Sequence, residues 1–491
     1  MLFNSLEFAI FLPLVFLIYW AIGYAHLNDT LKLRLQNAFV LIASYVFYGW
    51  WDWRFLILIV FTSLCSWGSG LLIVKSQITN NKSPLPKVWL WLNIVINLGI
   101  LGVFKYYDFF VSEFGQLFGI STYSLLLRII LPVGISFYTF QALSYSIDVF
   151  RKKIAPTKDI IAFFAFIAFF PQLVAGPIER ATNLLPQFLI NRKFSYDQGV
   201  DGMRQILWGL FKKIVIADNC ATYVDQVWAT YDTQTGSTLF LAAILFTFQI
   251  YGDFSGYSDI AIGIAKLFGI KLMRNFNNPY FSRDIAEFWR RWHISLTTWF
   301  RDYVYIPLGG SRVGKWKIVR NTFVIFLVSG IWHGANWTFL AWGAFHAILF
   351  LPLILLGANR KYTNQVAEGR ILPSWHETIQ ILCTFFLVVI GWIIFRSETI
   401  SQAWEILCGI WNESFFSIPT LTKTIYFGYI VIMLVIEWFS REKQHGLDFS
   451  QNTKPVISII KCLLYIVIAL LVEFYFLASI EHPTAFIYFQ F

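Results

Sequence analysis

The sequence predicts an all-α, polytopic membrane protein. Of its 491 residues, 57% are hydrophobic and only 13% are charged. Soluble globular chains have about 25% charged residues, so this composition excludes a soluble fold. Apolar runs long enough to form membrane-spanning helices also recur along the whole chain. We therefore expect about eleven or twelve transmembrane helices, together with re-entrant or interfacial helices.

Twelve apolar runs are candidates for the spans, because a span needs about 20 residues of helix, or fewer where protein surrounds it. They lie near residues 6–24, 37–51, 55–74, 88–111, 124–149, 203–220, 238–266, 318–333, 335–357, 377–395, 424–440 and 456–480. No basic residue precedes the first run, so we interpret it as a retained transmembrane helix and not as a secretory signal. The sequence shows no internal repeat and no soluble segment, which predicts one transmembrane domain over residues 1–491.

Two stretches do not have the character of simple spans. Residues 160–178 are apolar but contain Pro171, Gly176 and Pro177, and residues 282–310 carry seven charged side chains among aromatic ones. Charged or broken backbone at membrane depth is tolerated only where protein or water covers it. We expect both stretches to form re-entrant or interfacial helices on the cytoplasmic side.

Basic residues are distributed in the pattern that orients a membrane protein. With the N-terminus outside, Lys75 and Arg151 lie in cytoplasmic loops, whereas the outer loops 112–123 and 221–236 contain no Lys or Arg. We therefore attribute the net charge of +10 to membrane orientation. No feature of the sequence indicates binding of nucleic acid.

The region 271–320 is strongly basic, with ten basic and three acidic residues. One interpretation is ordinary cytoplasmic charge bias. The other is an anion site, for a phosphorylated donor or an acidic carrier protein, to which Arg290, Arg291 and Arg301 would contribute. Spacing alone does not decide between these two interpretations.

His333 lies inside a strongly apolar stretch, in the segment Ser-Gly-Ile-Trp-His-Gly-Ala-Asn at 329–336. An ionisable residue at apparent membrane depth is costly and is therefore a candidate functional residue. Histidine is also the side chain best suited to proton transfer near neutral pH. The structural alternative is a helix-end histidine bonded to a backbone carbonyl. Gly330 and Gly334 favour function, because they let a substrate or another helix approach closely.

His293, in the sequence Trp-His-Ile-Ser at 292–295, is the second candidate. On its own it is a weak signal, since histidines are common at membrane interfaces. One amphipathic segment and one span separate it from His333, so the two side chains can converge in the fold. One would then act as a base while the other orients the substrate or stabilises charge.

A group of polar residues, including Asp253, Ser255 and Asp259, interrupts the apolar run 238–266. These side chains either form interhelical hydrogen bonds or line a substrate channel. The aspartates need partners if they are buried, and we expect nearby arginines to supply them. The sequence has no HExxH, Walker or GxGxxG motif and no cysteine pair at metal spacing, so we expect no bound metal or other cofactor.

Several blocks of the sequence resemble the membrane-bound O-acyltransferase (MBOAT) family, in particular its bacterial branch of alginate and polysaccharide O-acetyltransferases. They are MLFNSLEFAIFLP at 1–13, FFPQLVAGPIER at 169–180, FQIYGDFSGYSDIAIGIAKLFG at 248–269, the stretch 275–310, SGIWHGANWTFLAWGAFHA at 329–347 and FIYFQF at 486–491. The resemblance implies an MBOAT fold, a ring of helices around a central funnel, with a catalytic core at about 130–350. It maps the family's invariant histidine onto His333 and its second histidine onto His293.

The resemblance implies acyl transfer from a cytoplasmic thioester to a hydroxyl outside. It implies acetyl-CoA or an acyl carrier protein as donor, an exported partner of the SGNH-hydrolase type, and a polysaccharide acceptor such as an alginate-like exopolysaccharide or a cell-wall glycan. The location that follows is a bacterial plasma (inner) membrane, which the chain would cross several times.

The chemistry of this reaction suggests roles for individual residues. The attacking hydroxyl needs a base, which His333 can supply, and the tetrahedral oxyanion needs hydrogen-bond donors. Trp332, Asn336 or His293 can serve as such donors. Asp253, Ser255, Trp332 and Asn336 are candidates for lining the substrate channel.

Two alternatives remain at the level of sequence. Within the family, the chain would transfer D-alanine from a carrier protein to teichoic acid, although the motifs at the N-terminus and at 248–310 favour acetyl transfer. Outside it, the chain would be a transporter or flippase, since polar residues inside spans also mark transport paths. That function predicts inverted repeats, which the sequence does not show.

Overall fold

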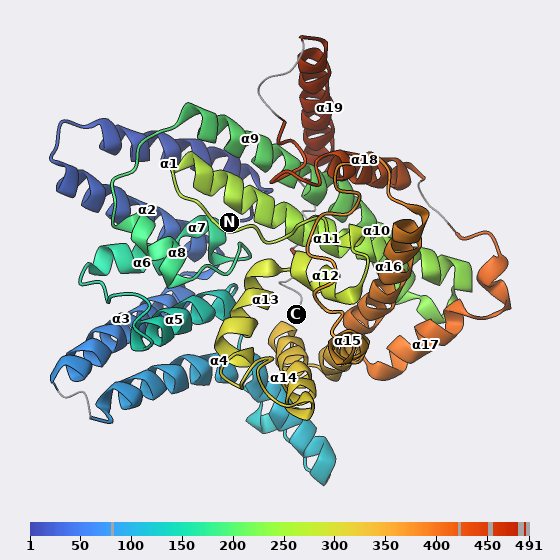
Figure 1. Cartoon of the computed structure of the whole chain (residues 1–491), viewed down its shortest axis with the longest axis horizontal. Helices are drawn as coiled ribbons and strands as arrows, with labels where there is room; N and C mark the ends of the chain where they lie inside the picture. The colour runs from blue at the N-terminus through green and yellow to red at the C-terminus, as the bar shows by residue number, and fades with distance from the viewer. Residues whose placement is uncertain (80–82, 421–423, 450–454, 480–485, 488–491) are drawn as a thin grey trace. The chain divides into compact units, whose positions relative to one another are not determined.

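The computed structural model describes residues 1–79, 83–420, 424–449, 455–479 and 486–487, and every regular element within these ranges is a helix (Figure 1). The all-α membrane fold predicted from the sequence is therefore confirmed. The chain divides into two compact units, one comprising Met1–Met203 and Ala261–Met273, the other Arg204–Ile260 and Arg274–Phe491. Both units contain candidate spans. A single transmembrane domain over 1–491 stays a prediction.

The first unit is built mainly from the N-terminal helices. Its elements are α1 Leu6–Tyr24, α2 Asp29–Asp52, η1 Trp53–Phe55, α3 Leu56–Thr79, α4 Leu85–Phe118, η2 Tyr123–Leu125, α5 Ile135–Phe150, α6 Ile160–Ala168, α7 Phe170–Leu173, α8 Ala181–Leu184, η3 Leu185–Phe188 and most of α9 Tyr196–Leu210. The stretch 160–178 thus contains two short helices and no span, as the sequence predicts. Whether these helices are re-entrant stays a prediction.

Polar side chains join three helices of this unit. Helices α3, α4 and α5 pack side by side (Figure 1). Between them, Ser66 Oγ of α3 donates to Asn93 Oδ1 of α4 at 3.1 Å, and Asn93 Nδ2 donates to Ser146 Oγ of α5 at 2.8 Å. All three residues are buried, so these bonds satisfy polar groups that the surrounding apolar side chains would leave unpaired.

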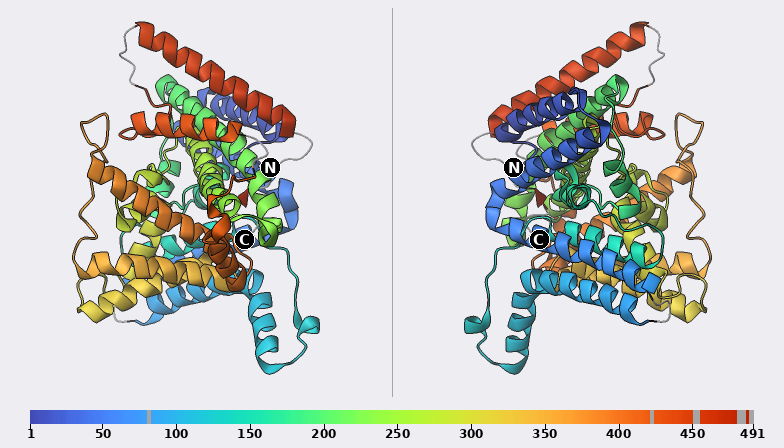
Figure 2. Two further views of the ribbon diagram at one scale, coloured as in Figure 1. Left: turned by 90° about the vertical axis from the view of Figure 1, so that its right-hand side faces the viewer. Right: turned by 90° about the vertical axis from the view of Figure 1, so that its left-hand side faces the viewer.

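Helix α4 is longer than a bilayer core is thick. Its 34 residues reach about 51 Å at 1.5 Å per residue, against a hydrocarbon core of about 30 Å. It ends at Gly119, which adopts the left-handed conformation with φ of 65° that commonly terminates helices. In Figure 2 the last turns of α4 and the segment that follows extend away from α3 and α5.

The second unit contains the segments that carry both candidate histidines. Its elements are η4 Phe211–Ala217, α10 Asp218–Ala229, η5 Tyr231–Thr233, most of α11 Gly236–Leu267, η6 Pro279–Phe281, α12 Ile285–Arg291, α13 Ile294–Phe300, η7 Arg301–Tyr305, α14 Lys315–His333, α15 Trp337–Leu355, α16 Trp375–Arg396, α17 Ile400–Ile410, η8 Glu413–Phe416, α18 Ile425–Phe439 and α19 Pro455–Ser479.

Eleven of the twelve apolar runs lie in helical segments, whereas the run 124–149 is irregular between η2 and the start of α5 at Ile135. Fewer helices than predicted are long and apolar enough to span. Among the described residues seven segments qualify, and one of these, Asp29–Thr79, contains both α2 and α3. Helices α5 and α18 have only 16 and 15 residues, short of the roughly 20 that a span needs. Helix α14 begins with Lys315, Lys317 and Arg320, which reduce its apolar length.

Helices α14 and α15 pack closely because of two glycines. A Cβ on Gly330 would lie 2.3 Å from the carbonyl oxygen of Phe339, and one on Gly343 would lie 2.5 Å from that of Phe326. A Cβ on Gly334 would meet the ring of Phe339 at 2.1 Å. The glycines around His333 therefore admit a neighbouring helix, which is one of the two explanations that the sequence left open.

We expect Gly330→Ala to destabilise the protein, because the new methyl group must push α15 away from α14. Overpacking of this kind costs about 1–3 kcal/mol. Thermal unfolding of the purified protein in detergent would show a lower midpoint. Gly428→Ala is the matched control, since Gly428 lies in a helix with nothing within 4 Å of its Cβ position. Equal midpoints for the two variants would contradict the packing argument.

Candidate functional site

The stretch 282–310 folds as short helices interrupted at His293. Helix α12 begins at Asp284, whose side chain accepts a hydrogen bond from the backbone N–H of Glu287 at 2.7 Å. Trp292 then has extended backbone, and His293 adopts the left-handed conformation with φ of 44° before α13 begins. The stretch thus forms short helices and no single span, as the sequence predicts, and its location relative to the membrane stays a prediction.

Hydrogen bonds from one neighbouring segment hold His293 in this uncommon conformation, which costs about 1–3 kcal/mol for a residue other than glycine. The backbone N–H of Ile294 donates to the carbonyl of Asn275 at 2.8 Å. The side-chain oxygen of Asn275 lies 3.1 Å from His293 Nδ1. His293 is 1% exposed, and this burial lowers its pKa to about 3, so the ring is neutral at physiological pH.

His333 is the last residue of α14 and is packed among aromatic rings. Its ring centroid lies 4.8 Å from that of Trp332, 5.1 Å from Trp342 and 5.3 Å from Phe395. The ring of Trp332 is also 5.8 Å from that of His293. Two histidines separated by 40 positions in the sequence therefore both contact one tryptophan.

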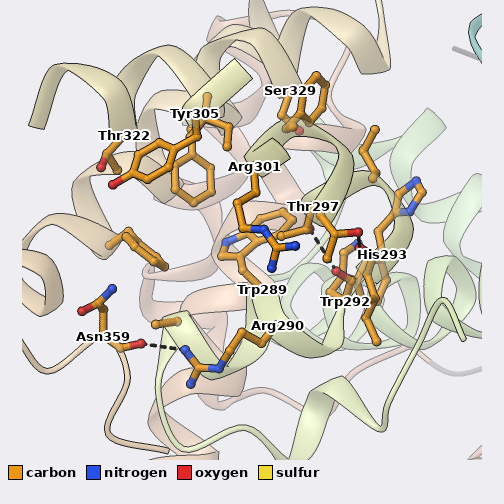
Figure 3. Close-up of a pocket in the computed structure, with 18 of the residues that line it drawn as sticks. Trp289, Arg290, Trp292, His293, Thr297, Arg301, Tyr305, Thr322, Ser329 and Asn359 are labelled. Atoms are coloured by element: carbon orange, nitrogen blue, oxygen red, sulfur yellow. Dashed lines mark hydrogen bonds between the residues drawn. The ribbon is translucent and has the colours of Figure 1, made fainter. Parts of the chain in front are cut away.

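Both histidines line one cavity of about 480 Å³, within the range of about 300–1,000 Å³ that is usual for small-molecule sites (Figure 3). Its walls come from α12, α13, η7, α14, the end of α15 and the segment after it. Most of the lining is apolar or aromatic, and the basic side chains in it are Arg290, Arg301 and Arg360. The cavity thus combines an apolar wall with cationic groups and a pair of imidazoles.

Two of the three arginines predicted to bind the donor lie at this cavity. Arg290 donates from Nη1 to the carbonyl of Asn359 at 2.6 Å, as Figure 3 shows, and from Nη2 to that of Tyr362 at 2.6 Å. Arg301 is exposed and bonds through Nε to Asp302 at 2.7 Å. Arg290 donates to neutral carbonyl groups, whereas Arg301 pairs with the carboxylate of Asp302. The positive charge of Arg290 in particular therefore favours an anionic ligand at the cavity.

Arg291, the third, is not among the cavity-lining residues. It bonds to the buried carboxylate of Glu287 through Nη2 at 2.7 Å and to Gln365 through Nη1 at 2.7 Å. Glu287 also accepts from Arg283 at 2.9 and 3.0 Å. One carboxylate that is 1% exposed therefore pairs with two guanidinium groups. These guanidinium groups in turn bond to Asn364 and Gln365 and tie α12 to that segment.

The polar cluster of α11 is paired with lysines and not with the arginines that the sequence suggested. Lys212 Nζ lies 2.6 Å from Asp259 and 2.8 Å from Ser255, and Lys213 Nζ lies 2.6 Å from Asp253. Both lysines come from the π-helical turn η4 and are buried. The prediction of arginine partners is therefore wrong. The sequence feature that indicates the correct partners is the Lys-Lys pair inside the apolar run 203–220.

These contacts match the first of the two interpretations of this cluster, interhelical hydrogen bonding, and neither Asp253 nor Ser255 lines the cavity. Asn336 also lies outside the lining. It is the N-cap of α15, where Oδ1 accepts from the backbone N–H of Thr338 at 3.0 Å and Nδ2 donates to the carbonyl of Glu398 at 2.8 Å. Trp332 contacts both histidine rings without lining the cavity. A channel role for these four residues stays a prediction.

Comparisons with known proteins along the chain all indicate acyltransferases. Residues 45–393 match the model of the membrane-bound O-acyltransferase family. The chain is 39% identical to the probable alginate O-acetylase AlgI of Pseudomonas aeruginosa, over 89% of this chain and 80% of that protein. It is 34% identical to the peptidoglycan O-acetyltransferase of Helicobacter pylori, over 86% and 82%. Identity to the teichoic acid D-alanyltransferase of Bacillus subtilis is 29%, over 54% and 69%.

We expect Glu287→Gln to destabilise the fold strongly. The change leaves Arg291 buried without this counter-charge and leaves Arg283 to the more distant carboxylate of Glu377, at 3.6 Å. Breaking a buried ion pair in this way costs about 3–5 kcal/mol. Chemical or thermal unfolding in detergent would measure the loss.

The matched control is Glu368→Gln, which removes an exposed carboxylate that, among the described residues, accepts from Asn364 at 3.2 Å. We expect its stability to stay within about 0.5 kcal/mol of the wild type, as for most surface substitutions. A Glu287→Gln variant as stable as this control would show that the two arginines do not depend on the carboxylate.

Proposed function

Because the chain belongs to the membrane-bound O-acyltransferase family, we propose that this membrane-embedded acyltransferase O-acetylates a polysaccharide outside the cytoplasm. The acetyl group would come from a cytoplasmic thioester, acetyl-CoA or an acyl carrier protein. The observation that carries the proposal is the single cavity that both histidines line together with three arginines. Family membership also decides between an acyltransferase and the transporter or flippase that the sequence left as an alternative.

The relatives support acetyl over D-alanyl transfer. The alginate and peptidoglycan O-acetyltransferases are more similar to the chain, and over a larger share of it, than the teichoic acid D-alanyltransferases. The acceptor in this proposal is accordingly an alginate-like exopolysaccharide or a cell-wall glycan. The chain would act in a bacterial plasma membrane with an exported partner of the SGNH-hydrolase type that completes delivery to the polymer.

The residues of the cavity suit acyl transfer from a thioester. The hydroxyl oxygen attacks the carbonyl carbon while one histidine accepts its proton, and the carbon–sulfur bond then breaks to release the thiolate. The other histidine is placed to stabilise the oxyanion. Arg290, Arg301 and Arg360 provide positive charge for the phosphates of CoA or of a carrier's prosthetic arm, and the aromatic wall excludes water from the reacting groups.

We expect His333→Ala to remove acetyl transfer while the protein remains folded. A positioned proton-transfer group contributes about 10²–10⁴-fold in rate, and the variant should lose at least the lower figure. His293→Ala should give a large but partial loss. The measurement is release of free thiol from acetyl-CoA by the purified protein in liposomes, together with mass spectrometry of the acetylated glycan.

His376→Ala is the control for this pair, because His376 is exposed in the first turn of α16 and does not line the cavity. This variant should transfer acetyl groups at the wild-type rate. Continued acetylation of the glycan by purified His333→Ala would overturn the assignment of that residue, and wild-type turnover of His293→Ala would remove His293 from the site.

We expect Arg301→Gln to raise the KM for acetyl-CoA without a matching fall in kcat. Since Arg301 is exposed, its loss should cost at most about 1 kcal/mol, or about fivefold in KM. Arg312→Gln serves as the control, because Arg312 is an exposed arginine of the same region outside the cavity. An unchanged KM for Arg301→Gln, or an equal increase for both variants, would argue against donor binding at this cavity.

A further inference from the structure

Helix α17 presents an apolar face that is exposed in the structure. Residues of an α-helix are spaced by about 100°, so those at intervals of three or four lie on one side. On α17 and the residue that follows it, one such stripe consists of Ile400, Trp404, Cys408 and Trp411. Trp404 and Trp411 are 67% and 66% exposed. Aromatic surface gathered in this way indicates contact with an apolar medium or an apolar partner.

The other sides of α17 differ from this stripe. Ala403, Ile406 and Ile410 are buried where α17 packs against the protein, which includes contacts with α15 and α16. Gln402 and Glu405 lie on a third side, which is polar and accessible. The part of α17 that faces outward therefore has an apolar side next to a polar one. This pattern is typical of a helix that lies along a membrane interface.

The segment after α17 continues the apolar surface. Phe416 at the end of η8 and Ile418 just beyond it are 91% and 93% exposed. A hydrogen bond ties this segment to the start of α11, where the backbone N–H of Gly236 donates to Ser414 Oγ at 2.7 Å. The backbone thus holds the two apolar side chains at the surface, and any cover for them comes from outside the described residues.

The place of α17 in the chain puts it at the level of a membrane boundary. Helix α16 is a candidate span that ends at Arg396, and only three residues separate it from α17. The chain from Arg396 to Ile400 therefore reaches at most about 14 Å. Asn336, directly before the candidate span α15, donates from Nδ2 to the carbonyl of Glu398 in this connection at 2.8 Å. One span thus begins where another ends, and α17 lies beside both.

We propose that α17 and η8 form an interfacial anchor, in which the stripe of α17 together with Phe416 and Ile418 is embedded in lipid on the side of the membrane where α14 ends. Tryptophan is enriched at such boundaries, because its large ring is apolar while its N–H is polar. None of the six side chains is charged, so the partner is the apolar part of the lipid layer and not a phosphate group. Asn336 joins the anchor to the turn that follows His333, which the anchor would therefore hold at a fixed depth.

A photoreactive side chain shows what covers the anchor. When p-benzoylphenylalanine replaces Trp404, irradiation of the full-length protein should give a phospholipid adduct, which mass spectrometry detects. The experiment is done in the membranes of the producing cells and in liposomes of phosphatidylethanolamine and phosphatidylglycerol. The same side chain in place of Glu405, on the polar side of α17, is the matched control and should give little lipid adduct. An adduct with protein alone at position 404, or no adduct, would rule the proposal out.

Thiol labelling gives a second measurement, because Cys408 lies in the stripe and is exposed. The variant Glu405→Cys adds a thiol on the polar side of the same helix, so both thiols lie on the same side of the membrane. In liposomes, a charged maleimide should label Cys408 at least about tenfold more slowly than the added thiol, because lipid excludes a charged reagent. Peptide mass spectrometry resolves the two positions. Equal labelling rates would place the stripe in water and contradict the anchor.

The link to the turn after His333 rests on the proposed acyl transfer. Replacing both tryptophans, Trp404→Ser with Trp411→Ser, should lower kcat in liposomes by up to about 100-fold, since a misplacement of about 1 Å can cost that much. The change in KM should be small, and Glu405→Ser is the control that should retain the wild-type kcat. A wild-type kcat in the double variant would contradict the link alone. Absence of acetyl transfer in the wild type would contradict the proposed function alone, and the lipid adduct tests the anchor in either case.

Discussion

A buried polar group in a membrane protein depends on the chain itself for its hydrogen-bond partners, because lipid supplies none. In the first unit this constraint places Asn93 between serines of two other helices. In the second unit it pairs the two lysines of η4 with aspartates of α11, and Glu287 with two arginines. The contacts of Asn93 and of the two lysines join separate helices and so help to determine their register, whereas Glu287 pairs with arginines four positions away on either side.

The same constraint builds the candidate site. Helix α12 has only seven residues, which is too few for a stable isolated helix, so its position depends on contacts at both ends. Glu287 fixes its first turn through Arg283 and Arg291, and Asn275 fixes the residues that follow it. His293 can therefore occupy a left-handed conformation that a free chain would rarely adopt. The hydrogen bonds that satisfy these buried polar groups also stabilise the strained conformation of His293.

The sequence predicted the helices and the two histidines, but not which way most polar side chains face. Apolar runs locate helices because the membrane demands length and hydrophobicity, and His333 and His293 stand out chemically from their neighbours. Arg290 and Arg291 look equivalent in sequence, yet adjacent helical residues point about 100° apart. One faces the cavity, and the other faces Glu287.

The sequence also did not reveal which polar residues far apart in the chain would pair. The partners of Asp253 and Asp259 lie 40 and 47 positions earlier in the chain, in a run whose apolar character suggested an ordinary span. Asn336 shows a further limit, since a polar residue beside a functional histidine is indistinguishable in sequence from a helix N-cap. Spacing along one helix can be read from the sequence, whereas contacts between helices depend on the packing of the whole unit.

The environments of the two histidines explain why they would divide the work of proton transfer and charge stabilisation. Two imidazoles in similar surroundings would compete for one proton, but dissimilar surroundings separate their roles. His293 lies with Nδ1 3.1 Å from the amide oxygen of Asn275 and packs against the ring of Phe254. His333 is enclosed by Trp332, Trp342 and Phe395, whose low polarity strengthens any interaction between a polar group and a developing negative charge. Two histidines that contact the same tryptophan would then meet the proton and the oxyanion in different surroundings, so each could keep one role as the reaction proceeds.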